Sequence, residues 1–170
     1  RKDMLSNEKS IECARCYEIE DAGMLSHRQS SNKSFARFIP LTKHTKTDGT
    51  YEDFKLRYYD IRFSNLCNFR CRSCGSVFSS NWYEDEKAVY GDPRHPKIMI
   101  AGRTKDDMWE QMEPHIPHLH QIYFAGGEPL IMEEHYRVLR ELVKRNRTDV
   151  ALVYNTNFSE LVYKNQNVLE

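Results

Sequence analysis

Residues 121–154, QIYFAGGEPLIMEEHYRVLRELVKRNRTDVALVY, decide the fold. The opening QIYFA is a short apolar run that ends at two glycines, which is typical of a strand. Apolar residues then recur on one helical face, with Glu133 and Glu134 in the first turn and basic residues in the last. The closing VALVY run is apolar without alternation, as in a strand buried on both faces of a parallel sheet. The stretch therefore predicts a strand, a helix and a second, parallel strand.

The sequence before this stretch extends the same pattern. Tyr58, Tyr59, Ile61 and Phe63 predict a first strand rich in aromatic and β-branched residues. Helices are expected over residues 77–87 and from Asp106 onward, so the three strands would be joined through helical crossovers. Strands joined in this way form a parallel α/β sheet, either open or closed into a barrel.

The chain divides by composition into two parts. Residues 1–53 are polar and weakly periodic, with a short helix expected over 18–25 that ends near Gly23. Residues 27–34 are expected to be a solvated stretch. The ordered α/β part would occupy residues 54–170. Because the sequence begins at Arg1 without a methionine and its last residues are expected to be helical, we interpret it as a piece of a longer protein.

Charge and cysteine content exclude several classes of function. Lys and Arg number 25 and Asp and Glu also number 25, so no basic excess favours nucleic acid or an anionic membrane surface. No run approaches the roughly 18 apolar residues of a membrane helix. Five cysteines is an odd count, and they are clustered, whereas disulfide-linked secreted domains use even counts. Clustered thiols favour metal ligands in a reducing compartment, which predicts a cytoplasmic protein.

Three of the cysteines lie in the loop after the first predicted strand. Cys67, Cys71 and Cys74 have CxxxCxxC spacing in LCNFRCRSCG. Three thiolates are one short of the four that saturate a zinc ion or an iron–sulfur cluster, and an open position is where a metal does chemistry. After the second strand, Gly126 and Gly127 permit close backbone approach, and the Glu128 carboxylate can hold an ammonium group. Ligands of parallel α/β folds gather at these carboxyl ends of strands.

These two motifs, LCNFRCRSCG and FAGGEPL, resemble those of the radical S-adenosylmethionine enzymes. The sequence around them resembles the twitch or SPASM-type branch of that family. The resemblance covers Leu56 to Glu170. It implies a partial (β/α) barrel of the TIM type, truncated to about three strand–helix units, so that residues 54–170 would be the N-terminal half of the radical domain. A family barrel has more strands, so half of an active site is expected here.

The resemblance also implies roles for single residues. Cys67, Cys71 and Cys74 would bind three irons of a 4Fe–4S cluster, and S-adenosylmethionine would chelate the fourth. Gly126, Gly127 and Glu128 would hold the amino group of the cofactor, and Phe69 would shield the cluster. An electron, from a donor such as a flavodoxin or ferredoxin, would cleave the cofactor to a deoxyadenosyl radical that abstracts hydrogen from an unidentified substrate, a peptide among the candidates. No residue of this chain is assigned as catalytic.

Alternatives stay open at several positions. Asn157, after the third strand, is placed to reach cofactor or substrate, or to cap a helix. Cys13 and Cys16 form a separate CxxC, which is either half of a second iron–sulfur or zinc site or a pair of unliganded thiols. The whole chain could instead be a non-enzymatic zinc-binding interaction module, in which the loop cysteines share a structural zinc with Cys13 and Cys16. The third interpretation is a degenerate radical S-adenosylmethionine fold, which would keep the cluster but have no catalytic turnover.

Overall fold

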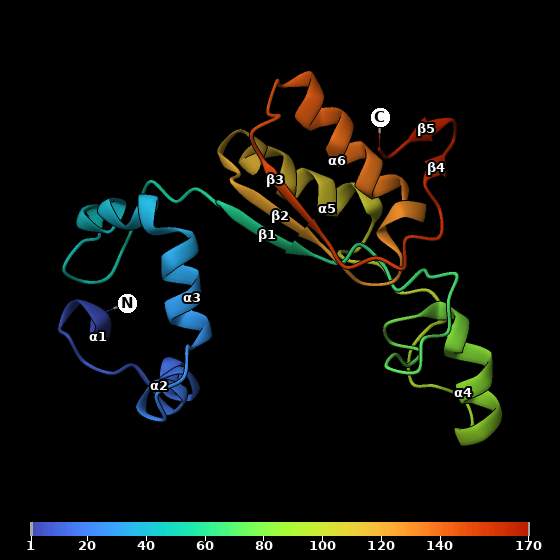
Figure 1. Cartoon of the computed structure of the whole chain (residues 1–170), viewed down its shortest axis with the longest axis horizontal. Coiled ribbons are helices and arrows are strands. Elements are labelled where there is room, and N and C mark those ends of the chain that lie inside the picture. Colours follow the sequence, from blue (N-terminus) through green and yellow to red (C-terminus); the bar gives the residue numbers. More distant parts are fainter. Residues whose placement is uncertain (1, 170) are drawn as a thin grey trace. The chain divides into compact units, whose positions relative to one another are not determined.

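The chain divides into two compact units, Arg1–Phe54 and Lys55–Glu170 (Figure 1). The computed structural model describes residues 2–169. The division falls one residue after the boundary expected from composition, and each unit is described by itself. None of the helices among residues 2–169 combines the length and the apolar character needed to cross a membrane.

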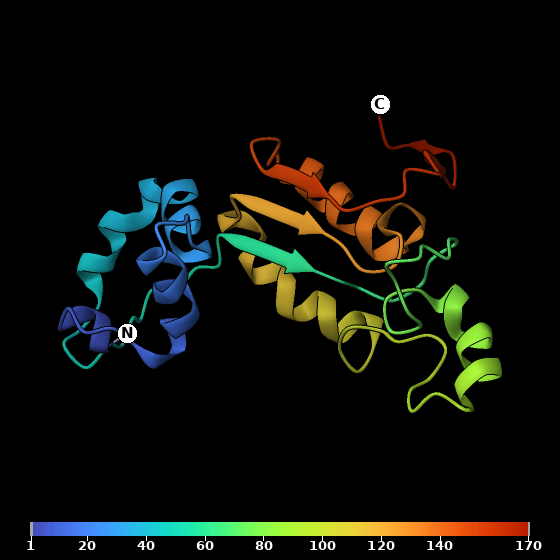
Figure 2. The same cartoon turned by 60° about the horizontal axis from the view of Figure 1, so that its bottom comes forward.

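The second unit contains a parallel sheet of three strands. They are β1 (Tyr58–Ile61), β2 (Gln121–Phe124) and β3 (Ala151–Tyr154), in the order β1-β2-β3 (Figure 2). Each neighbouring pair is parallel. The three predicted strands and their parallel pairing are therefore confirmed, but the expected burial of the third strand on both faces is wrong, because Ala151, Leu152 and Val153 are exposed. Within residues 2–169 the sheet is open rather than closed, and the partial barrel stays a prediction.

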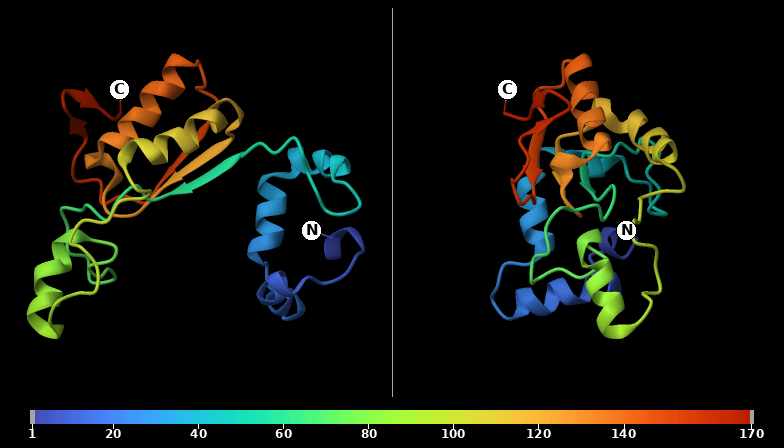
Figure 3. Two further views of the ribbon diagram at one scale, coloured as in Figure 1. Left: turned by 180° about the vertical axis from the view of Figure 1, so that it is seen from behind. Right: turned by 90° about the vertical axis from the view of Figure 1, so that its right-hand side faces the viewer.

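Two helices cover one face of this sheet, α5 (Lys105–Met112) and α6 (Glu133–Lys144) (Figure 3). Alternate strand residues such as Ile61, Ile122 and Phe124 point to that face and form the core with residues from both helices. The helix α6 follows its predicted pattern, because its apolar stripe is buried while its acidic and basic ends face the favourable poles of the helix dipole. Thr104 begins α5 by accepting a hydrogen bond from the Asp107 amide.

The helix expected over residues 77–87 begins later. The structure has a 3₁₀ turn, η3 (Ser80–Trp82), followed by α4 (Tyr83–Tyr90). Ser76 and Ser79 are buried and use their hydroxyl groups in tertiary contacts, with His95 and with the carbonyl of Phe69. Serine side chains that bond elsewhere compete with helix formation, so the segment before residue 80 is irregular.

The prediction of a helix at the end of the sequence is wrong. Residues there form an antiparallel hairpin of β4 (Val162–Tyr163) and β5 (Gln166–Asn167). Lys164 and Asn165 both have positive φ, as the two-residue turns that match strand twist require. The remaining short turns of this unit are η4 (Glu113–His118) and η5 (Pro129–Ile131).

The first unit is helical throughout its regular structure. Its elements are α1 (Lys2–Leu5), η1 (Ile11–Cys13), α2 (Ala14–Asp21), α3 (His27–Ser34) and η2 (Ala36–His44). The helix expected over 18–25 thus lies four residues earlier, and the stretch expected to be solvated is α3. A capping box explains α3, because Ser26 and Gln29 each bond the other's backbone amide.

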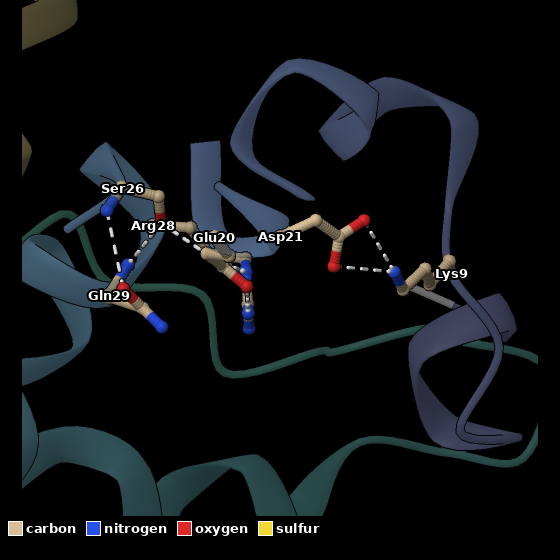
Figure 4. A network of polar contacts seen from close by, with 6 residues as sticks. All are labelled: Lys9, Glu20, Asp21, Ser26, Arg28 and Gln29. Carbon is tan, nitrogen blue, oxygen red and sulfur yellow. Dashed lines mark hydrogen bonds and ion pairs between the residues drawn. The ribbon is translucent and has the colours of Figure 1, made fainter. Parts of the chain in front are cut away.

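Polar contacts rather than a core hold the first unit together (Figure 4). Ser26 Oγ donates to Glu20 Oε1 at 2.5 Å, and Arg28 donates to both oxygens of the same carboxylate. Lys9 pairs with Asp21 at 3.4 Å. Among residues 2–54 the only buried side chains are polar, Ser10 and Ser26. The unit therefore lacks the apolar burial that stabilises an ordinary small domain.

Candidate functional site

The three loop cysteines line one cavity at the carboxyl ends of the strands. The cavity holds about 210 Å³, and it is lined by Cys67, Phe69, Cys71, Ser73, Cys74, Phe78, Ser79, Gly127, Asn155, Thr156 and Asn157. These residues come from the loops after β1, β2 and β3. The structure therefore brings together the loop cysteines, Phe69, Gly127 and Asn157, as the sequence predicted.

The cysteine loop is fastened to the segment that follows it. Ser79 Oγ donates to the carbonyl of Phe69 at 2.6 Å, and Trp82 Nε1 donates to the carbonyl of Cys71 at 3.0 Å. Within the loop, the Cys74 amide donates to the carbonyl of Cys71 at 2.9 Å. These bonds fix the backbone while the thiols line the cavity. The contact of Trp82 with the cysteine loop was not predicted from the sequence.

The backbone at Gly127 packs directly on the start of the cysteine loop. Its φ is +55°, and a Cβ atom at this position would lie 2.1 Å from the carbonyl oxygen of Leu66. The Gly127 amide donates to Phe78, and the Glu128 amide donates to that same Leu66 oxygen at 2.8 Å. Only glycine permits this approach. Gly126 does not line the cavity but a neighbouring depression of about 260 Å³, where a Cβ would meet the side chain of Arg62.

Glu128 lies behind the cavity wall. Its side chain is fully buried. Its carboxylate accepts hydrogen bonds from the Leu130 amide at 3.0 Å, the Thr156 hydroxyl at 2.6 Å and the Asn157 amide at 2.7 Å. The carboxylate thus joins the loop after β2 to the loop after β3. Sequence reasoning missed the role of Thr156, for which the only signal was a hydroxyl residue directly after a strand.

Asn157 faces the cysteine loop. Its Nδ2 donates to Asn68 Oδ1 at 2.9 Å and lies 4.0 Å from Cys67 Sγ. Its Oδ1 accepts from the Ser159 amide in a local turn. The helix-capping alternative for Asn157 is wrong, because the next regular element is the β4–β5 hairpin.

All five cysteines are free thiols. Cys13 precedes the first residue of α2, and Cys16 lies in its first turn, both half-buried within the first unit. Across the described residues, no three His, Cys, Asp or Glu side chains are grouped so that they could hold a metal ion. The loop cysteines therefore share a cavity without forming a ready-made metal site.

Comparison with known proteins identifies no relative: no family model matches the chain, and neither a curated protein nor a solved structure does.

Proposed function

We propose that the second unit is part of a radical S-adenosylmethionine enzyme, in which the CxxxCxxC loop holds a 4Fe–4S cluster. One observation carries the proposal: Cys67, Cys71 and Cys74 line the same cavity as Gly127, the second glycine of the FAGGEPL motif. Two motifs that lie more than fifty residues apart in the sequence thus meet at one place, the carboxyl edge of a parallel sheet.

The residues around the cavity fit such a group by their chemistry. Three thiols, the donors that iron–sulfur clusters prefer, line the cavity, and among residues 2–169 no carboxylate or imidazole lines it. Because Gly127 has no side chain, its backbone can lie directly against the start of the cysteine loop. Because the thiols are not grouped as metal ligands in the structure, loading requires the loop to draw them together.

Each part of the chain has a task in this proposal. Cys67, Cys71 and Cys74 would bind the cluster, and Phe69 would limit its contact with water. When bound, the cluster and S-adenosylmethionine supply an electron transfer that generates a radical able to abstract hydrogen from substrate. The protein would orient these groups with the Gly127 backbone and with the polar side chains of Thr156 and Asn157, which line the cavity. The same proposal places the protein in the reducing cytoplasm and includes a small protein, such as a flavodoxin or ferredoxin, as its electron donor.

Anaerobic reconstitution of the full chain with iron and sulfide tests the proposal. We expect a coloured, oxygen-sensitive cluster whose electron paramagnetic resonance signal changes when S-adenosylmethionine is added. Cys71→Ala should abolish iron binding, whereas a matched Cys13→Ser, Cys16→Ser variant should retain this cluster and its response. A colourless protein that carries stoichiometric zinc would instead identify the zinc-binding interaction module.

Turnover is a separate question from cluster binding. With dithionite as reductant, the loaded chain or a longer form that contains it should cleave S-adenosylmethionine to deoxyadenosine. A cluster that responds to the cofactor but never cleaves it, in either form, would identify the degenerate fold.

A further inference from the structure

We infer that Glu128 is a positioning residue, whose carboxylate holds the loop after β3 against the cysteine loop rather than contacting a ligand in the cavity. The inference rests on the proposed function, but the experiment that tests it uses the metal-free chain and needs no cluster. It departs from the expectation that the resemblance gave for this residue, which was contact with the amino group of the cofactor.

The carboxylate is bound by three donors of the protein itself. Of its roughly four lone-pair positions, two on Oε1 accept from the Leu130 amide and the Thr156 hydroxyl and one on Oε2 accepts from the Asn157 amide, at 2.6–3.0 Å. The side chain is fully buried and does not line the cavity. Thr156 and Asn157 line the cavity and both donate to this carboxylate, so an ammonium group in the cavity meets these two residues before it meets Glu128.

Glu128 connects two loops that meet at Cys67. Its backbone amide donates to the carbonyl of Leu66, the residue directly before Cys67. Its side chain accepts a hydrogen bond from the backbone amide of Asn157. The side-chain amide of Asn157 in turn lies against Cys67 and Asn68. Loss of the carboxylate would therefore release the Asn157 loop from the wall of the cavity and expose the Cys67 thiol.

Thiol alkylation of the reduced, metal-free full chain tests the inference without any cluster. Iodoacetamide is applied at fixed pH, and the rate at each cysteine is measured by peptide mass spectrometry. Glu128→Gln should raise the rate at Cys67 several-fold, because the amide presents a donor where donors now converge. Cys13 and Cys16 serve as internal controls in the first unit and should react at unchanged rates.

Thr156 separates positioning from general loss of structure. Thr156→Val keeps the shape and removes the hydroxyl, which donates to Glu128 and also accepts from the Phe158 amide, so this variant should raise the Cys67 rate in part. Thr156→Ser keeps the hydroxyl and should react at the wild-type rate. Glu160→Gln changes an exposed carboxylate in the same loop and should have no effect. These variants decide the question even if Glu128→Gln fails to fold.

An opposite pattern would overturn the inference. If Cys67 reacts equally fast in the wild type, Glu128→Gln and Thr156→Val, Glu128 does not position the loop. If Glu128→Gln also weakens S-adenosylmethionine binding to the reconstituted protein while its cofactor-free resonance signal stays unchanged, Glu128 is a ligand-binding residue. Failure to form any cluster would sink the proposed function but leave the alkylation result valid.

Discussion

The hydroxyl of Tyr154 lies 2.9 Å from Nε2 of His135, inside the layer between β3 and α6. Both rings also pack on Phe124. Burial lowers the pKa of His135 to about 4 and raises the pKa of Tyr154. The other ring nitrogen of His135 is buried and has no hydrogen-bond partner in the part of the chain that the structure describes, which adds to the preference for a neutral ring.

This histidine makes stability depend on pH. The unfolded chain takes up a proton near pH 6.5, whereas the folded chain resists it until about pH 4. The free energy of unfolding should therefore be at its full value above pH 6.5 and fall by on the order of 3 kcal/mol as the pH drops towards 4. Urea unfolding followed by tryptophan fluorescence measures this, because both tryptophans, Trp82 and Trp109, lie in the second unit.

His135→Gln should flatten this part of the profile. If it leaves the slope as steep as that of a matched His27→Gln variant, the assignment is wrong.

Gly127→Ala should destabilise the second unit strongly. The new methyl would collide with the carbonyl of Leu66, and the positive φ would be strained as well. Gly91→Ala separates the two causes, because Gly91 also has positive φ but has nothing within 4 Å of the added atom. We expect a loss of about 1–3 kcal/mol at Gly91, where φ of 87° and ψ of −172° form a backbone conformation that few other residues adopt, and a larger loss at Gly127, from urea unfolding. Equal losses at the two sites would show that close packing on Leu66 is unimportant.

Periodicity was sufficient to predict the sheet of the second unit. The apolar runs at β1, β2 and β3 and the one-sided stripe of α6 are strong local signals of strands and helix. Burial was predicted less well, because the continuous apolar run of β3 indicated two buried faces and most of its residues are exposed. The hairpin at Lys164 was missed because positive φ at two non-glycine residues leaves little trace in composition. The helix α3 was missed because a capping box outweighed a polar sequence.

The candidate site was predictable only in part. Cysteines and glycines that follow neighbouring parallel strands must meet at one edge, so their gathering follows from topology. The burial of Glu128 does not, because it depends on donors supplied by Thr156 and Asn157, nearly thirty residues away. Which polar groups a carboxylate satisfies is decided by tertiary structure, and single-sequence patterns do not contain it.

Ser26→Ala should loosen the first unit. Its hydroxyl accepts from the Gln29 amide at the start of α3 and donates to Glu20, so alanine removes both contacts at once. Loss of a helix N-cap costs about 0.5–2 kcal/mol. Hydrogen exchange of the α3 amides should accelerate accordingly, by roughly tenfold for each 1.4 kcal/mol. Ser30→Ala, an exposed position within the same helix, should leave this exchange unchanged or slow it slightly. Similar acceleration in both variants would remove the special role of Ser26.

A metal should stabilise the first unit through Cys13 and Cys16. Small units without an apolar core commonly need a disulfide or a metal, and no apolar side chain among residues 2–54 is buried. Cys13 lies directly before α2 and Cys16 in its first turn, and CxxC is a common spacing of zinc ligands, so the two thiols can bind one zinc or iron ion and leave two positions for other ligands. Binding at a free metal concentration one hundred times the dissociation constant would add about 2.7 kcal/mol.

Hydrogen exchange of α2 and α3 with and without zinc measures this effect. We expect slower exchange in the presence of zinc, both in the wild type and in a variant whose loop cysteines 67, 71 and 74 are serine. Exchange in Cys13→Ser, Cys16→Ser should not respond. Because the two variants remove different thiols from the same chain, zinc protection confined to the second unit would place the metal in the cysteine loop. The N-terminal CxxC would then be a pair of unliganded thiols.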